Sequence, residues 1–102
     1  MATDLTWTSA ERRLDPAHPA ARGHFPGNPI IPGAVLLAEI LDTISASACG
    51  IRSAKFLAPV RPGDRLLIRW QKAREDEIKF EASLADGRLA LSGLLLLEAD
   101  TP

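Results

Sequence analysis

One stretch of this 102-residue chain decides its fold: Gly23-His24-Phe25-Pro26-Gly27-Asn28-Pro29-Ile30-Ile31-Pro32-Gly33. Because proline fixes φ and lacks a backbone N–H, this stretch cannot form a regular helix or strand. Its large apolar side chains make it unsuitable as a solvated linker. We therefore expect a rigid, ordered loop over residues 15–33, and long ordered loops in small domains are usually functional.

Apolar residues at helical spacing follow this loop. Between Ala34 and Ala48 they are Leu36, Leu37, Ile40, Leu41, Ile44 and Ala48. This period predicts an amphipathic central helix over about residues 34–48, with Gly50 as its stop signal. Glu39 and Asp42 fall outside the apolar stripe.

Beyond Gly50 the apolar period changes to two, which is typical of half-buried antiparallel strands. The inward positions are Leu66, Ile68, Trp70, Ile78, Phe80, Ala82 and Leu84. We expect strands over about residues 51–98, and a weaker first strand over residues 5–14. The last of them, residues 88–98, is apolar on both faces. A single α+β domain over residues 1–102, with an antiparallel sheet wrapped around one long helix, would bury these faces economically.

Composition narrows the function classes. The formal net charge is −1, so the basic excess of a nucleic-acid-binding protein is absent. The single cysteine, Cys49, allows no intrachain disulfide and no cysteine-based metal site. The chain shows no targeting segment and no apolar run long enough to span a bilayer, so we expect a cytoplasmic protein that does not bind membranes.

Two motifs resemble those of a known family. Residues 23–33 resemble the signature loop G-H-F-P-G-x-P-x-x-P-G of the beta-hydroxyacyl-acyl carrier protein dehydratases, which leads into their central helix. Residues 54–64, Ala54-Lys55-Phe56-Leu57-Ala58-Pro59-Val60-Arg61-Pro62-Gly63-Asp64, resemble the second such stretch. Residues 15–19 are similar to the corresponding segment of the family's small single-domain members. The resemblance covers about residues 5–98.

This resemblance implies a hot-dog fold and at least a homodimer with active sites at the subunit interface. It implies dehydration of a 3-hydroxyacyl thioester, on acyl carrier protein or CoA, to the trans-2-enoyl thioester, or the reverse hydration. No metal or organic cofactor is implied.

The residue chemistry agrees with this reaction. Removing the proton alpha to a thioester needs a base that titrates near neutrality, which suits His24. His18 lacks such a context and is assigned no role. The unpaired N–H groups at the start of the helix, introduced by Pro32, Gly33 and Ala34, suit a thioester oxygen that gains negative charge. Together with Phe25, these are the expected substrate-binding residues.

The family's helix acid is missing. Its position, counted from Gly33, is Ala38. Glu39 lies about 100° further round the helix, whereas Asp42 lies one turn after Ala38 on nearly the same face. Three alternatives stay open: Glu39 swings into the site, Asp42 replaces the acid, or the fold serves as a thioesterase or a non-catalytic acyl- or carrier-binding subunit.

Basic residues surround the motif regions in sequence: Arg22, Arg52, Lys55, Arg61, Arg65 and Arg69. Carrier proteins are acidic, so a basic rim would steer them to the site. A solvated surface is the alternative role for each of these side chains.

Overall fold

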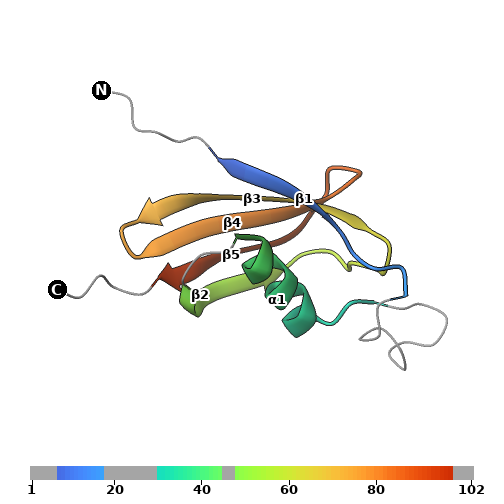
Figure 1. The fold of residues 1–102 in the computed structure, drawn as a ribbon, viewed down its shortest axis with the longest axis horizontal. Helices are drawn as coiled ribbons and strands as arrows, with labels where there is room; N and C mark the ends of the chain where they lie inside the picture. Colours follow the sequence, from blue (N-terminus) through green and yellow to red (C-terminus); the bar gives the residue numbers. More distant parts are fainter. Residues whose placement is uncertain (1–6, 18–29, 45–47, 98–102) are drawn as a thin grey trace.

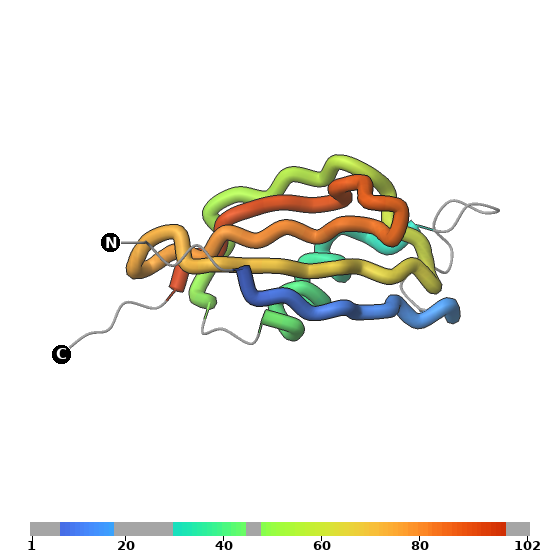
Figure 2. Tube along the Cα trace, turned by 90° about the horizontal axis from the view of Figure 1, so that it is seen from above, coloured from blue at the N-terminus to red at the C-terminus, as the bar shows by residue number. Residues whose placement is uncertain are grey.

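The computed structural model describes residues 7–17, 30–44 and 48–97. Its elements are β1 (Thr8–Arg13), α1 (Gly33–Ile44), β2 (Ala48–Phe56), β3 (Arg65–Arg74), β4 (Glu77–Leu84) and β5 (Leu89–Leu97). The five strands form one antiparallel sheet in the order β1-β3-β4-β5-β2, which Figure 2 shows from above. Helix α1 packs across one face of this sheet (Figure 1). The predicted α+β architecture is confirmed.

The core lies between α1 and the sheet. Every fourth residue of the helix is buried there, at Leu36, Ile40 and Ile44. The sheet contributes the period-two residues of its central strands, including Leu66, Ile68, Phe80, Ala82, Leu91 and Leu95, all of which are fully buried. The alternation read from the sequence therefore identifies the inner face of β3 and β4 correctly. In the described ranges no helix has the length and apolarity that a membrane crossing requires.

The predicted end of the helix was wrong. Helix α1 ends at Ile44, and Ala48 and Gly50 belong to β2, where they pair with Leu97 and Leu96 of β5. Thr43 hydrogen-bonds back to the carbonyl of Glu39 at 2.9 Å, a contact that weakens helix propagation. Residues 45–47 lie outside the described ranges.

Strand β2 approaches β5 very closely at Gly93. A Cβ at Gly93 would lie 2.3 Å from the carbonyl oxygen of Ser53 and 2.8 Å from the ring of Phe80. The pairing of β2 with β5 also shifts register between Ile51 and Ser53. Only a residue without a side chain fits between the bulged edge strand and this core ring.

Candidate functional site

Helix α1 begins directly after the proline-rich loop. Ile31 is buried, and its N–H donates to the carbonyl of Val60 at 2.8 Å, which ties the end of the loop to the β2–β3 connection. The first helical hydrogen bond runs from the N–H of Leu36 to the carbonyl of Pro32 at 3.0 Å. The N–H groups of the residues between these two have no acceptor within the helix. The positive end of the helix dipole is therefore available to an oxygen that gains negative charge.

The ring of Phe56, at the end of β2, lies against this first turn. A Cβ on Gly33 would be only 2.9 Å from Cζ of Phe56, so the close contact requires glycine. Gly33, one of the expected substrate-binding residues, therefore also allows an aromatic ring to approach the helix. Phe56 remains 51% exposed. Phe56 belongs to the second motif, but neither a role for it nor its contact with α1 was predicted.

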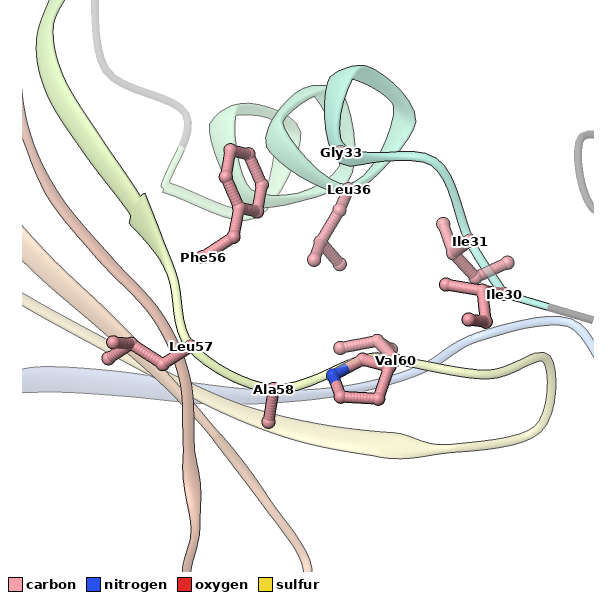
Figure 3. Close-up of a pocket in the computed structure, with 9 residues that line it drawn as sticks. Ile30, Ile31, Gly33, Leu36, Phe56, Leu57, Ala58 and Val60 are labelled. Atoms are coloured by element: carbon pink, nitrogen blue, oxygen red, sulfur yellow. The ribbon is translucent and has the colours of Figure 1, made fainter.

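An apolar cavity of about 440 Å³ opens between the start of α1 and the segment after β2. Figure 3 shows Leu36 pointing into it from the helix, with Phe56 beside the helix and Val60 on the opposite wall. The lining residues are Ile30, Ile31, Gly33, Leu36, Phe56, Leu57, Ala58, Pro59 and Val60. The two resemblance motifs thus form the walls of one cavity, and its chemistry suits an acyl chain.

Both helix carboxylates are bound by Arg12 of β1. Its Nε lies 2.6 Å from Oε2 of Glu39, and its Nη1 donates to Oδ2 of Asp42 at 2.8 Å. The same Nη1 donates to Oγ1 of Thr43 at 3.0 Å. The hydrogen bond with Asp42 is the largest cause that raises the pKa of Arg12 above its ordinary value. Both candidate acids therefore act as ion-pair acceptors of one guanidinium.

A second groove of about 430 Å³ lies beside this ion-pair network, lined by Arg12, Ala34, Val35, Ala38, Glu39 and Asp42. Ala38, where the resemblance implies the helix acid, is exposed there. The side chain of Glu39 is 22% exposed and that of Asp42 is 74% exposed. Glu39, Asp42 and Ala38 therefore share one groove, whereas Gly33 lines the apolar cavity.

The remaining predicted site residues divide between described and undescribed ranges. His24 and Phe25, the expected base and its neighbour, lie outside the described residues, as do His18 and Arg22. Pro32 caps α1 but lines neither of the two cavities, and Ala34 lines only the second. Arg12 was missed by the sequence analysis, because its contact with α1 joins residues about thirty positions apart.

Among the described residues, several of these basic side chains are held in ion pairs or line a polar pocket. Arg52 pairs with the buried Glu77 at 3.3 Å, and Arg69 pairs with Glu81 at 2.6 Å while lying 4.4 Å from the centre of the Trp7 ring. Two others, Arg61 and Arg65, line a polar pocket near the β4–β5 turn.

Comparison with known proteins agrees with this architecture. Residues 3–94 match the ApeI-like family, described as ApeI dehydratase. The chain belongs to the ApeI-like dehydratase family. Its fold is the predicted hot-dog fold, a five-stranded antiparallel sheet with one central helix. One solved structure similar to this ApeI-like chain is the dehydratase heterocomplex ApeI:P from Xenorhabdus doucetiae. It has a TM-score of 0.74 and 25% identity, over 88% of this chain and 85% of that one.

Curated relatives of this ApeI-like chain include two 3-hydroxyacyl-[acyl-carrier-protein] dehydratases FabZ. The protein from Mannheimia succiniciproducens is 34% identical over 107 residues, which is 88% of this chain and 71% of the relative. The protein from Thermomicrobium roseum is 34% identical over 92 residues, which is 76% of this chain and 59% of the relative. The predicted dehydratase relationship is confirmed at the level of the family.

Proposed function

We propose that this ApeI-like chain binds 3-hydroxyacyl thioesters, on acyl carrier protein or CoA, and removes water to form the trans-2-enoyl thioester, or catalyses the reverse hydration. The observation that supports this most is the apolar cavity at the start of α1. Both motifs that resemble the dehydratases line it or lead into it. An acyl chain in this cavity would bring its thioester carbonyl to the unpaired N–H groups of the helix.

His24 is the proposed base. It would take the proton from C2, and the electron pair would move into the thioester carbonyl to form an enolate. Collapse of the enolate breaks the C3–O bond, and the hydroxyl leaves as water after it gains a proton. This loss of water is redox-neutral, and the proposal includes no cofactor.

The second proton must come from another residue, because Ala38 occupies the position of the helix acid. A general acid must carry a proton and reach the leaving hydroxyl. Glu39 and Asp42 are the candidates, and each would first have to release Arg12, to which they bind at 2.6 Å and 2.8 Å. We therefore propose that this chain dehydrates its substrate more slowly than relatives that carry the helix acid at the position of Ala38.

The test is a turnover assay with 3-hydroxybutyryl thioesters of carrier protein and of CoA, read as enoyl formation by absorbance and mass. We expect His24→Asn to lower the rate by about 100-fold or more, the usual contribution of a general base. His18→Asn is the matched control and is expected to keep the rate within about twofold. Equal rates in both variants, with the fold intact, would remove His24 from the mechanism.

The same assay separates a thioesterase from a dehydratase. Hydrolysis of the thioester releases a free thiol, whereas dehydration leaves the thioester intact. Thiol release without enoyl formation would replace the dehydratase proposal. Glu39→Gln and Asp42→Asn, measured side by side, identify which carboxylate supplies the proton. Only the substitution of the residue that acts as general acid should lower the dehydration rate.

A second candidate function is an acyl-binding subunit that pairs with an acid-bearing homologue. The exposed Ala38 and the ion pairs that hold Glu39 and Asp42 favour it. The similar dehydratase from Xenorhabdus doucetiae is a heterocomplex. Under this proposal the chain alone shows no turnover, and activity appears when a homologue with an acid at the equivalent helix position is added.

A further inference from the structure

A small polar pocket of about 220 Å³ adjoins the apolar cavity, because Pro59 lines both. Its walls come from the β2–β3 connection and the β4–β5 turn. The lining residues are Pro59, Arg61, Asp64, Arg65, Leu84, Ala85, Asp86 and Arg88. Three arginines and two aspartates thus line a space large enough for one phosphate group.

The two aspartates shape the loops that carry the arginines. Oδ2 of Asp64 accepts the backbone N–H of Arg61 at 2.8 Å. Asp86 accepts the backbone N–H of Arg88 at 3.0 Å and its Nε at 2.7 Å. These hydrogen bonds, the backbone one first, lower the pKa of Asp86, so it stays ionised at neutral pH.

The outer nitrogens of two arginines remain available for an anion. Asp86 binds Arg88 through Nε. The Nη1 and Nη2 groups of Arg88 have no hydrogen-bond partner among the described residues. Nη1 of Arg65 lies 3.6 Å from the Glu11 carboxylate, which is longer than a charge-assisted hydrogen bond. A guanidinium whose outer nitrogens are not already hydrogen-bonded matches the geometry of a phosphate.

We propose that this pocket binds the phosphate of the pantetheine arm that carries the acyl group. The inference rests on the proposed function, because the arm is brought here by an acyl chain in the adjoining cavity. Thirteen bonds separate the thioester sulfur from that phosphorus, a reach of roughly 15 Å by analogy with extended backbone. The arm would cross Pro59 and place its phosphate between Arg65 and Arg88. Carrier protein and CoA share this phosphate, so one pocket serves both.

The test compares S-butyryl-4′-phosphopantetheine with S-butyryl-pantetheine, which lacks only the phosphate. Neither has a hydroxyl to lose, so both report binding alone. We expect the phosphorylated thioester to bind at least about tenfold more tightly to the native chain, by calorimetry. In the double variant Arg65→Gln/Arg88→Gln, the preference for the phosphorylated thioester should fall to about twofold or less. The affinity for butyryl-pantetheine should be unchanged. Arg74→Gln, at the exposed β3–β4 turn, is the control and keeps the preference.

The outcomes separate this proposal from the proposed function. Equal binding of the two thioesters to the native chain would overturn the phosphate pocket and leave acyl binding standing. A double variant that keeps the full preference would overturn it as well. Failure to bind either thioester would overturn both proposals. Binding of butyryl-CoA and of butyryl-carrier protein then identifies which molecule supplies the phosphopantetheine. The physiological carrier is expected to bind more tightly than phosphopantetheine alone.

Discussion

At the scale of single residues, Arg12 determines which charged groups of α1 are available for chemistry. It joins β1 to the helix through Glu39 and Asp42, at 2.6 Å and 2.8 Å. The sequence predicted both carboxylates as candidates, because the helical period places them near Ala38. It did not reveal their common partner, since the pairing of β1 and α1 depends on the tertiary fold.

Replacement of Arg12 by Gln is expected to lower the free energy of unfolding by about 0.5–1.5 kcal/mol, because partly exposed ion pairs are screened by solvent. Urea denaturation at low and high salt measures this, and the difference from the native chain should shrink as salt is added. Arg13→Gln, on the neighbouring exposed position of β1, is the control and is expected to change stability by less. Equal losses in the two variants would show that the Arg12 network contributes nothing.

At the scale of elements, the strands were more predictable than the end of the helix. Strands β3 and β4 alternate cleanly, so their period identifies the buried face. The boundary between α1 and β2 was misplaced because Ala48, Cys49 and Gly50 suit a helix end as well as a strand. Their pairing with β5 decides the outcome, and that contact joins residues far apart in the chain.

A substitution at Gly93 tests the close packing of β2 against β5. Gly93→Ala would press its methyl group against the Ser53 carbonyl and the Phe80 ring, neither of which can move freely. We expect a loss of about 3 kcal/mol or more in the free energy of unfolding, at or above the upper end for overpacked cores. Gly50→Ala is the matched control, because its nearest neighbour, Leu96 Cδ1, would lie at an ordinary 3.7 Å. A Gly93→Ala variant as stable as the control would contradict this packing.

At the scale of the whole molecule, the sheet has two edge strands, β1 and β2. Of the four large apolar side chains that are exposed in the described ranges, three lie on β2 or directly after it: Ile51, Phe56 and Leu57. The resemblance to the dehydratases implied at least a homodimer. We propose that a second copy of the chain covers the edge formed by β2, which adjoins the apolar cavity.

Sedimentation is expected to give twice the chain mass of 11.0 kDa. Ile51→Lys should weaken the dimer, because it places a charge on the edge that would be buried. Leu67→Lys is the control: Leu67 is similarly exposed but lies on β3, away from this edge, and the variant should remain dimeric. A monomer at all concentrations, or equal dissociation in both variants, would contradict assembly through β2.

The most direct test of the central claim is the dehydration rate of Ala38→Glu, with 3-hydroxybutyryl-carrier protein as substrate. If α1 borders a dehydratase site in which Ala38 takes the place of the better-positioned acid, the variant should form enoyl thioester about 100-fold faster than the native chain, the usual contribution of a general acid. This gain should disappear when His24→Asn is added. A folded Ala38→Glu variant that shows no gain, or a gain that does not depend on His24, would contradict the account.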